Sequence, residues 1–580
     1  MHWYMTVLLI LAMATVALAA PAVTDLQAQY RNGQVFLTWN ETPGLEGTLV
    51  VRTSLEPVTA ANVAQAAVLA EGLNPRSADD WWLNPETYGN PLEKGKVRPP
   101  REGFLIAAGG QKLNPDSGLH VHTVGPDEVG SYYYAVTTRD AAGVDDLDVT
   151  PGANALAQPV AQKAEAFEPI WQKAEAPLDP ATTKGMPMHL ILHAKTGIGG
   201  MEFLAFGDKS LGWREGLPFK FGVRISGDAV IVTPTDRTWI GRMFPEGRDG
   251  CQKLTPAIHS FWYGYNSNIN KPEKMAEGVA TNYTERRVLW IMDWVQKTFQ
   301  TDPNRVYASG SSMGGCGMMA VAFRHPERFA AIYAHVPIVA YDKGVGGDSL
   351  MRIVAECGDV DKPCSEGMTV RERLDATKFA REHKGDLPFL LIANGRKDMS
   401  IPWWKNPDFY RAMRDNRHGF VAAWNEGDHG GCGGALPEDI KRMTNLRSFY
   451  NIALNKSYLA FSNSSLDDDP GNGDAANGTP VGYMNRGLWW EEPVDEAGRY
   501  EVVVKWTLEA DKLPVTVDVT PRRLQAFRLK PGETVTARNI AVGTGAEVQK
   551  ETLKADEDGL LTFKGFKVTA PEGNRLVLSR

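Results

Sequence analysis

The chain has 580 residues, of which 43% are hydrophobic and 23% charged, with 57 Gly and 36 Pro among them. This composition is that of ordinary globular proteins, and it excludes collagen-like, coiled-coil and wholly disordered chains. Because 62 Lys and Arg face 70 Asp and Glu, the formal net charge is −8, so no global positive field draws the chain onto nucleic acid or anionic lipid, and neither is an expected partner.

The N-terminus has the pattern of a secretory signal. Residues 6–18 read TVLLILAMATVAL, and Ala17 and Ala19 follow the apolar run at the −3 and −1 spacing of a signal-peptidase site. The run is too short to span a bilayer comfortably. We expect residues 1–19 to be a cleaved signal and the mature protein to be secreted or periplasmic, free of the membrane. An uncleaved anchor is the alternative, because the preceding MHWYM has no Lys or Arg.

Residues 20–160 consist of short strand-like segments separated by turns. Asn32-Gly33, between QAQY and QVFLTW, predicts a tight hairpin. The segments GQVFLTW and GSYYYAVTTRDAAG resemble the second strand and the late Tyr-bearing strand of a fibronectin type III domain. This resemblance implies a β-sandwich that carries SADDWWLNPETYGNPLEKGKVRPP as an insertion.

The stretch 161–183 has a different composition. It carries QKAEA twice, among Pro, Ala, Glu and Lys. Such a segment buries little apolar surface, so we expect an exposed linker.

Residues 184–455 alternate continuous apolar runs with helical stretches. The runs are MHLILHA, AVIVTPT, RVYASG, FAAIYAHVP, LPFLLIAN and GFVAAWN, and strands buried on both faces have this character. TERRVLWIMDWVQKTF has the helical period, with Thr284 as the expected N-cap. We expect an α/β domain with a mostly parallel sheet covered by helices on both faces.

Residues 456–580 return to a β pattern, with segments such as YEVVVKWTL, VTVDVT and LLTFKGFKVTA. They predict a second β-sandwich, so that two β domains flank the α/β domain. The acidic stretch LDDDPGNGDAANG lacks regular ligand spacing, which favours a solvated turn over a Ca²⁺ site. The pair Trp489-Trp490 either stacks on sugar rings or packs in a core.

A nucleophile motif lies within RVYASGSSMGGCGMMAVAF. Gly310-Ser311-Ser312-Met313-Gly314 fits G-x-S-x-G and stands directly between a predicted strand and a predicted helix. In that context the motif forms a sharp turn with the serine at its apex. Ser312 is therefore the candidate nucleophile, in preference to Ser309 and Ser311.

A base and an acid follow at the ends of two later strands. Asp398 comes shortly after LPFLLIAN, and His429 comes shortly after GFVAAWN. Acyl transfer by a serine needs a base and a group that orients the base, so we assign His429 as the base and Asp398 as its partner. A structural role for Asp398, in a turn or cap, is the alternative. Five other histidines lack the order Ser, Asp, His with each residue just after a strand: His193, His259, His325, His335 and His418.

Acyl transfer also needs donors for the oxyanion. One expected donor is the backbone N–H of Met313, which follows the nucleophile. The other is expected in AKTGIGG, which follows MHLILHA, as the N–H of Lys195 or Thr196. This chemistry requires neither a metal nor a cofactor, and we expect none.

Together these motifs resemble the α/β-hydrolase superfamily, and within it the secreted esterases grouped with polyhydroxybutyrate depolymerases and feruloyl or acetylxylan esterases. The likeness covers about residues 184–455 and includes LILHA, DPNRVYASGSSMGG, HPERFAAIYAHVP, NGRKDMSIP and GDHGG. It implies a serine esterase with nucleophile, acid, base and oxyanion donors at Ser312, Asp398, His429, Met313 and Lys195.

The chain departs from this pattern at one position and shares another motif more widely. Ala194 follows His193 where these relatives usually have Gly, which bears on the second oxyanion donor. NGRKDMSIP is also similar to the acid loop of prolyl-oligopeptidase-like peptidases. That family is therefore a competing interpretation.

Aromatic loops suggest a substrate surface. HSFWYGYN and IPWW follow predicted strands, where pockets of this fold lie, and flat rings suit sugar or phenolic faces. The candidate substrate-binding residues are Trp262, Tyr263, Trp403 and Trp404; packing is the alternative role. Flanking β domains suit a polymeric or oligomeric ester substrate such as a polysaccharide, because a tethered module raises the local concentration of the enzyme.

Five cysteines lie in the middle of the chain, at positions 251, 316, 357, 364 and 432. An odd number leaves at least one without an intrachain partner. Export permits disulfides, and the candidate pairs are Cys357 with Cys364 and Cys316 with Cys432. Buried free thiols are the alternative.

Three hypotheses of function result. The first is a secreted serine carboxylesterase that acts on a polymeric ester, with plant polysaccharide acyl groups ahead of polyhydroxyalkanoate. The second is a prolyl-oligopeptidase-like serine peptidase. The third is a non-catalytic glycan-binding protein whose hydrolase domain has lost its activity.

Overall fold

The structure, a computed structural model, describes residues 22–79, 103–175, 177–192, 203–239, 257–341, 348–430, 432 and 436–580. The expected signal peptide and most of the Pro- and Trp-rich insertion lie outside these residues. The chain divides into two compact units. One comprises the described residues of 22–79, 103–104 and 113–167, and the other comprises those of 105–112 and 168–580.

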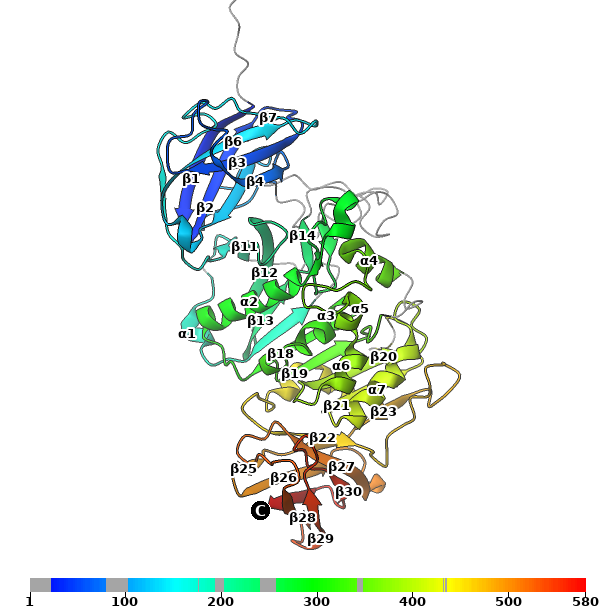
Figure 1. The fold of residues 1–580 in the computed structure, drawn as a ribbon. Helices are drawn as coiled ribbons and strands as arrows, with labels where there is room; N and C mark the ends of the chain where they lie inside the picture. The colour runs from blue at the N-terminus through cyan, green and yellow to red at the C-terminus, as the bar shows by residue number, and fades with distance from the viewer. Residues whose placement is uncertain are drawn as a thin grey trace, which may run out of the picture. The chain divides into compact units, whose positions relative to one another are not determined.

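The N-terminal unit is a β-sandwich (Figure 1). One sheet has the order β1-β2-β5, and the other has the order β4-β3-β6-β7 with β8 beside β6. The strands are β1 (Val23–Arg31), β2 (Gln34–Glu41), β3 (Thr48–Ser54), β4 (Ala67–Leu73), β5 (Gly118–Thr123), β6 (Gly130–Arg139), β7 (Asp145–Asp146) and β8 (Val160–Gln162). Their apolar side chains, among them Leu37, Val51 and Val136, share one core.

The hairpin predicted at Asn32-Gly33 is confirmed. β1 and β2 pair antiparallel, with Arg31 opposite Gln34. Asn32 and Gly33 have φ values of 42° and 73°, which suits the type I′ turn that favours these two residues.

The stretch expected as a linker belongs instead to the two units. Residues 160–162 form β8, where the side chain of Gln162 accepts a hydrogen bond from Tyr134 and donates one to the carbonyl of Glu128. Further on, β9 (Ile170–Trp171) pairs with Phe203 and Leu204 in the central sheet of the second unit. Phe167 and Ile170 are buried, so a few apolar side chains fix a segment whose average composition is polar.

Ten strands form the central sheet of the second unit, in the order β23-β21-β20-β19-β18-β10-β13-β12-β11-β9. The remaining bounds are β10 (Met188–Leu192), β11 (Phe203–Gly207), β12 (Leu217–Ser226), β13 (Ala229–Pro234), β18 (Val306–Ser311), β19 (Ala331–His335), β20 (Phe389–Gly395), β21 (Phe420–Asn425) and β23 (Gly482–Met484). Neighbours from β13 to β21 are parallel, and the outer pairs are antiparallel. The predicted mostly parallel sheet is confirmed.

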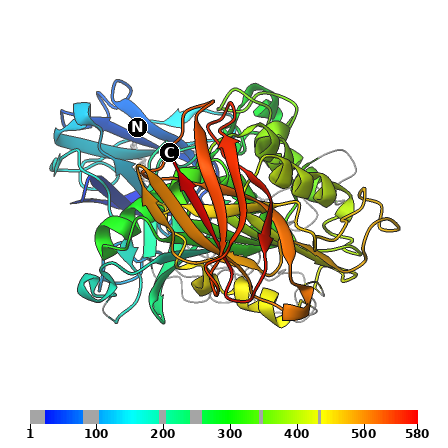
Figure 2. The same ribbon diagram turned by 90° about the horizontal axis from the view of Figure 1, so that it is seen from below.

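Helices cover both faces of this sheet. They are α1 (Pro180–Thr183), α2 (Tyr283–Phe299), α3 (Met313–Ala322), α4 (Asp348–Cys357), α5 (Val370–Leu374), α6 (Ala376–Glu382), α7 (Asn406–Asp415) and α8 (Glu438–Thr444). Figure 2 shows α8, in yellow, on the opposite side of the sheet from α6 and α7. Two small sheets pair β14 (Arg237–Trp239) with β15 (Ala257–His259) and β16 (Tyr265–Asn266) with β17 (Ala280–Thr281).

Of the apolar stripe predicted for helix α2, Val288, Met292, Val295 and Phe299 are buried and Leu289 is half-buried. Its N-cap is Asn282 and not the predicted Thr284. The hydroxyl of Thr284 is buried, lies 2.5 Å from the hydroxyl of Ser260 and accepts a hydrogen bond from Arg287. Thr284 therefore makes tertiary contacts and does not cap the helix.

The C-terminal segment is the second predicted β-sandwich. Its sheets are β22-β27-β30 and β24-β26-β31-β28-β29, with β25 beside β26. The strands are β22 (Tyr458–Ser462), β24 (Leu488–Trp490), β25 (Val494–Glu496), β26 (Arg499–Trp506), β27 (Val515–Arg522), β28 (Thr534–Ala541), β29 (Glu547–Lys554), β30 (Phe563–Val568) and β31 (Asn574–Ser579).

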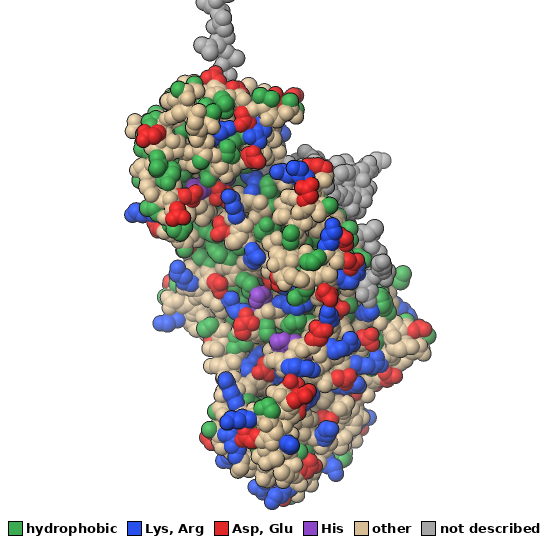
Figure 3. All heavy atoms as spheres, viewed as in Figure 1, with side chains coloured by type: hydrophobic (Ala, Val, Ile, Leu, Met, Phe, Trp, Pro, Cys, Tyr) green, Lys and Arg blue, Asp and Glu red, His purple; other side chains and the backbone are tan. Residues whose placement is uncertain are grey.

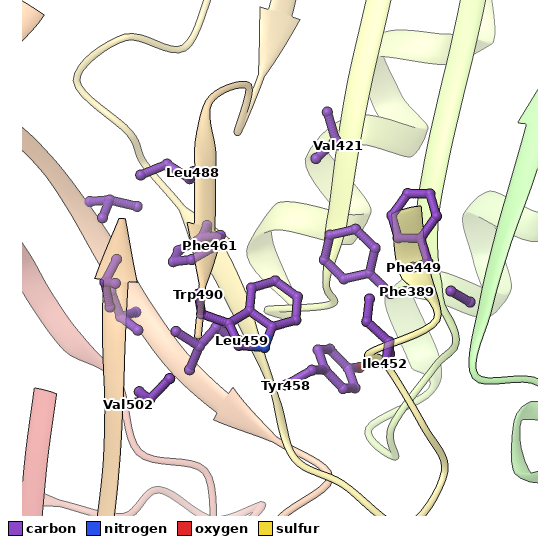
Figure 4. Close-up of a cluster of buried hydrophobic side chains, with 14 of the residues drawn as sticks. Phe389, Val421, Phe449, Ile452, Tyr458, Leu459, Phe461, Leu488, Trp490 and Val502 are labelled. Carbon is purple, nitrogen blue, oxygen red and sulfur yellow. The ribbon is translucent and has the colours of Figure 1, made fainter. Parts of the chain in front are cut away.

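This sandwich shares its core with the α/β domain. Figure 4 shows Phe389 and Phe449 of the α/β domain beside Tyr458 and Trp490 of the C-terminal segment. The rings of Trp489 and Trp490 stack with centroids 4.6 Å apart and pack on Phe389. Core packing is therefore the role of this pair, and the α/β domain and the C-terminal sandwich do not have separate cores.

The four described cysteines are free and buried: Cys316, Cys357, Cys364 and Cys432. The two predicted disulfides are therefore wrong for this structure. The thiol of Cys316 accepts the N–H of Ile338 at 3.3 Å, whereas Cys432 packs in the core shared with the C-terminal segment. Cys251 lies outside the described residues.

Candidate active site

Ser312 stands at a sharp turn between β18 and α3. Its φ of 56° and ψ of −120° are strained for a residue with a side chain. The turn is held by the N–H of Ser312, which donates to the carbonyl of His335 on the next strand at 2.9 Å. A Cβ at position 310 would lie 2.2 Å from the carbonyl oxygen of Gly314, so glycine is required there. The turn predicted from G-x-S-x-G is present.

Asp398 lies in the loop that follows β20, and its side chain is 1% exposed. One carboxylate oxygen, Oδ1, accepts the N–H groups of Ser400 and Ile401, both at 2.8 Å. These two bonds fix the orientation of the carboxylate. The second oxygen, Oδ2, is left to face the loop that follows β21.

His429, in that loop, connects the other two residues. Its Nδ1 lies 2.7 Å from Oδ2 of Asp398, and its Nε2 lies 2.8 Å from Oγ of Ser312. A neutral imidazole that donates from Nδ1 and accepts at Nε2 satisfies both contacts. The structure thus brings Ser312, His429 and Asp398 together in one hydrogen-bonded series.

The expected oxyanion donors fall on two segments. Met313 is the first residue of α3, where backbone N–H groups have no acceptor within the helix and the helix dipole favours negative charge. Lys195 and Thr196 lie outside the described residues. The strand before them, β10, pairs with β18 so that Leu192 is opposite Gly310, and the chain therefore leaves β10 beside the turn at Ser312.

A second serine-histidine pair, which the sequence pattern did not indicate, lies next to the nucleophile. Nδ1 of His335 is 2.8 Å from Oγ of Ser311. Burial, followed by the nearby His429, lowers the pKa of His335, which keeps this ring neutral at neutral pH. Its Nε2 has no hydrogen-bond partner among the described residues. A base of this kind lacks the orienting carboxylate that His429 has.

Three of the four aromatic residues expected to bind substrate are enclosed, which contradicts the expectation of an open aromatic surface. Trp262 and Tyr263 are 0% and 1% exposed, and Trp403 is 3% exposed. Trp262 lies against α3, where a Cβ at Gly317 would be 2.3 Å from its ring. The guanidinium of Arg373 stands 5.4 Å from the Tyr263 ring centroid.

The fourth ring, Trp404, is half-buried. The ammonium group of Lys405 lies 4.4 Å from its centroid. By contrast, the Trp403 ring lies 5.9 Å from the ring centroids of Tyr410 and Trp424, inside the domain. Adjacent residues in one aromatic motif therefore differ in burial, and of the four only Trp404 is half-buried instead of buried.

Asp236, which the sequence analysis did not select, organises the turn that holds Trp262. One of its oxygens accepts the N–H groups of Ser260 and Trp262, at 3.1 and 3.0 Å, and the hydroxyl of Ser260 at 2.5 Å. Phe261 and Trp262 both have positive φ. The only signal in the sequence is an aspartate shortly after the apolar run of β13, and an aspartate at the end of a strand does not by itself reveal its partners.

The acidic stretch 466–478 is folded by its own carboxylates. Asp467 accepts backbone N–H groups of Ser464 and Asn485, and Asp469 accepts that of Gly471. Within the described residues, no group of three or more His, Cys, Asp or Glu is arranged to hold a metal ion. None of the helices in the described ranges is both long and apolar enough to cross a bilayer.

Figure 3 shows Lys and Arg side chains interspersed with Asp and Glu on the face in view, without a continuous patch of one sign. This pattern agrees with the small formal net charge of −8.

The sequence matches the prolyl oligopeptidase family over residues 283–456. This segment begins at α2, contains the turn at Ser312 and the loops of Asp398 and His429, and ends after α8. Together with the mostly parallel sheet covered by helices, the match supports an α/β-hydrolase fold for this part of the chain. No curated protein matches the chain significantly.

The solved structures found to be similar to this chain include both esterases and peptidases. An S-formylglutathione hydrolase from Agrobacterium tumefaciens is 16% identical with a TM-score of 0.29, over 53% of this chain and 86% of its own. A ferulic acid esterase is 13% identical with a TM-score of 0.25, over 43% and 79%. An acylaminoacyl peptidase from Pyrococcus horikoshii is 15% identical with a TM-score of 0.29, over 74% and 55%. These likenesses are too distant to assign a substrate.

Proposed function

We propose that this protein is a secreted serine carboxylesterase that hydrolyses esters of a polymeric substrate through a covalent acyl-enzyme. The observation that carries the proposal is the hydrogen-bonded series from Ser312 through His429 to Asp398. A serine hydroxyl is a weak nucleophile until a base removes its proton, and Nε2 of His429 is 2.8 Å from that hydroxyl.

In the proposed reaction, Oγ of Ser312 attacks the ester carbonyl while His429 takes the proton. The imidazolium then gives this proton to the departing alcohol, which leaves Ser312 acylated. Water attacks the acyl-enzyme with His429 again as the base, and the acid product and free Ser312 are released. Asp398 holds the imidazole in the required tautomer and stabilises its charged form.

The tetrahedral intermediate carries an oxyanion at each step. We assign the N–H of Met313 as one donor, because it begins α3 directly after the nucleophile. Lys195 is assigned as the second donor from its place after β10, the strand that neighbours β18. Neither donor needs a metal or a cofactor to act.

The ester preference rests on the motifs shared with secreted esterases, DPNRVYASGSSMGG and GDHGG. The side chain of His429 is 34% exposed, which suits a reacting bond within a large substrate. Trp404 is the aromatic candidate for contact with a sugar or phenolic face. We propose plant polysaccharide acyl esters first and polyhydroxyalkanoate second, acted on outside the cytoplasm after removal of residues 1–19.

A prolyl-oligopeptidase-like peptidase is the second candidate, and the family match over residues 283–456 favours it. The same three residues would serve amide hydrolysis. The purified protein should be compared on short p-nitrophenyl esters and on peptidyl anilides. Faster cleavage of the anilides would favour the peptidase. Acetyl, feruloyl, methyl-uronate and hydroxybutyrate esters would then identify the acyl group.

A fluorophosphonate probe tests the nucleophile itself. The wild-type protein should be labelled, Ser312→Ala should not, and Ser311→Ala, which removes the neighbouring hydroxyl, should keep the label. Labelling that persists in Ser312→Ala would place the nucleophile elsewhere. A wild-type protein that takes no label would support the third candidate, a glycan-binding protein without activity.

A further inference from the structure

Arg396 is a buried cation between the end of β20 and Asp398, and it is 4% exposed. Its backbone N–H donates to the carbonyl of Asn425 at the end of β21, at 2.8 Å. The following residue, Lys397, donates its N–H to the carbonyl of Gly427 at 3.1 Å. The loop of Asp398 is thus bonded, residue by residue, to the loop that carries His429.

The guanidinium of Arg396 reaches a third segment. One terminal nitrogen, Nη2, donates to the carbonyls of Ala475 and Asn477, at 2.5 and 2.8 Å. The other, Nη1, is 3.8 Å from a carboxylate oxygen of Glu426. The guanidinium also lies 5.9 Å from the Trp403 ring centroid. We call residues 396–405, between β20 and α7, the acid loop, and residues 426–430, after β21, the histidine loop. The side chain of Arg396 therefore connects the acid loop, the histidine loop and the C-terminal segment.

The C-terminal contact belongs to a closely packed loop, residues 471–478, which we call the clamp loop. A Cβ at Gly473 would lie 2.2 Å from the carbonyl oxygen of Trp404, so the loop backbone rests on the acid loop. Just beyond it, the carbonyl of Thr479 accepts the indole N–H of Trp424 at 2.8 Å. The strand β23 then joins the edge of the hydrolase sheet beside β21.

Stability alone is a poor explanation for a charge at this place. Burying a guanidinium costs free energy unless its donors are satisfied. The Nε of Arg396 has no partner among the described residues, and its nearest described carboxylate contact is the one at 3.8 Å. What the side chain does provide is a fixed fork that sets the distance between the clamp loop and the acid loop.

We propose that Arg396 is a positioning residue, which with the clamp loop holds Asp398 against Nδ1 of His429. The inference rests on the proposed function, and it assigns part of the C-terminal domain to the catalytic apparatus. Arg396 touches none of the reacting atoms. Its effect passes through Lys397, the one residue that separates it from Asp398.

The test compares Arg396→Met and Arg396→Lys with Arg411→Met. Arg411, on α7, is the matched control because its guanidinium also donates to the clamp loop, at the carbonyl of Gly471, 2.5 Å away. It lies outside the acid loop. Steady-state kinetics on a p-nitrophenyl ester should show a roughly 10²-fold lower kcat for Arg396→Met with KM nearly unchanged, the effect of a misplaced catalytic group. Arg396→Lys should fall between, and Arg411→Met should stay near wild type.

Two further readouts separate positioning from general loss of structure. Guanidinium ion added to Arg396→Ala should recover part of the lost kcat, because it can enter the vacated site. Hydrogen exchange of the amides of Ser400 and Ile401, which bond to Asp398, should be faster in the Arg396 variants than in Arg411→Met. If Arg396→Met does not fold, Arg396→Lys and Gly473→Ala carry the same comparison.

Wild-type kcat and unchanged exchange in Arg396→Met would overturn the proposal, and so would an equal loss in Arg411→Met. Hydrogen exchange does not depend on activity. If Ser312 proves not to be the nucleophile, faster exchange at Ser400 and Ile401 would still establish that Arg396 positions Asp398, and unchanged exchange would refute it.

Discussion

The two oxygens of Asp398 have different partners, and this division makes its role testable. Oδ1 accepts two backbone N–H groups, while Oδ2 faces Nδ1 of His429 at 2.7 Å. An asparagine has one acceptor oxygen and one donor nitrogen. If the oxygen keeps the two backbone bonds, the amide nitrogen faces His429 and favours the tautomer that cannot accept from Ser312.

We therefore expect Asp398→Asn to fold normally and to lose about 10⁴-fold in kcat. The measurement is steady-state ester hydrolysis, with thermal unfolding as the control for folding. The rate of fluorophosphonate labelling should fall as well, since it depends on the same base. Near-wild-type turnover would show that another carboxylate orients His429.

A second residue-scale prediction concerns pH. His418 is fully buried, and its Nε2 is 2.9 Å from the carbonyl of Ala380. Burial, and then the nearby Arg522, lowers the pKa of His418 to about 3. In the unfolded chain a histidine takes up its proton near pH 6.5. Between these two pH values the unfolded state binds more protons, so the free energy of unfolding falls as the pH falls, by about 1.4 kcal/mol per pH unit for this one residue.

His418→Gln removes the titrating ring and can still donate to Ala380. Urea unfolding of both proteins at pH 8, 6, 5 and 4 measures the slopes. We expect the variant to lose stability less steeply than wild type below pH 6.5, whatever the constant cost of the substitution at pH 8. Parallel curves would mean that His418 can be protonated in the folded state.

The site residues that sequence could predict are those fixed by strand ends. Ser312, Asp398 and His429 each follow a buried parallel strand, and such ends meet at one edge of a sheet. The aromatic residues lack this constraint: Trp403 and Trp404 are adjacent, yet one is enclosed and the other half-exposed. The role of Arg396 was not predicted because its hydrogen-bond partners, the carbonyls of Ala475 and Asn477, are distant in sequence. No local sequence pattern indicates such a contact.

At the scale of elements, β27 shows how the C-terminal sandwich is attached to the α/β domain. Its last residue, Arg522, is 1% exposed and bonds to the carboxylate of Asp386 at 2.8 Å. The same guanidinium donates to four carbonyls in the segments before β20 and β21, those of Lys384, Gly385, Asn416 and Arg417. Nearly every donor of the side chain is used, as a buried charge requires.

We expect Arg522→Met to lower the free energy of unfolding by about 3 kcal/mol, because it leaves those buried acceptors without a donor. Arg499→Met is the control. Arg499, on β26 of the same sandwich, is 54% exposed and pairs with Glu501, and surface pairs contribute little. Its replacement should change stability by less than about 0.5 kcal/mol. Urea unfolding measures both, and equal effects would contradict the attachment role of Arg522.

The apolar pattern predicted whether a segment is a helix or a strand, but it did not predict which sheet or unit the segment joins. The alternating and continuous runs predicted β-sandwich and parallel-sheet strands, and the structure has both. Composition averaged over 161–183 hid Phe167 and Ile170, whose burial assigns the segment to two units. Strand β23 is short, and α8, β22 and the acidic stretch lie between it and β21 in the sequence. Its place at the edge of the hydrolase sheet therefore depends on long-range contacts, which the period of apolar residues does not reveal.

At the scale of the whole molecule, the predicted three-part chain behaves as two units. The α/β domain and the C-terminal sandwich share one buried cluster, whereas the N-terminal sandwich has a core of its own. The sequence predicted the sandwich at 456–580 but not the core that it shares with the hydrolase domain. The apolar residues of a strand predict that one face is buried, but they do not indicate which surface will cover it.

This organisation predicts how the chain unfolds. Leu576 on β31 and Leu37 on β2 are both fully buried, one in the shared core and one in the N-terminal core. Leu→Ala at such sites costs about 2–5 kcal/mol. We expect Leu576→Ala to lower the temperature of the transition that unfolds the α/β domain, although the substitution lies in the C-terminal sandwich. Calorimetry measures this temperature, and hydrogen exchange of the amides of α3 reports when the α/β domain unfolds. Leu37→Ala should lower a separate transition and leave exchange in α3 unchanged. If Leu576→Ala instead melts the C-terminal sandwich alone while α3 stays protected, the shared core does not make one cooperative unit.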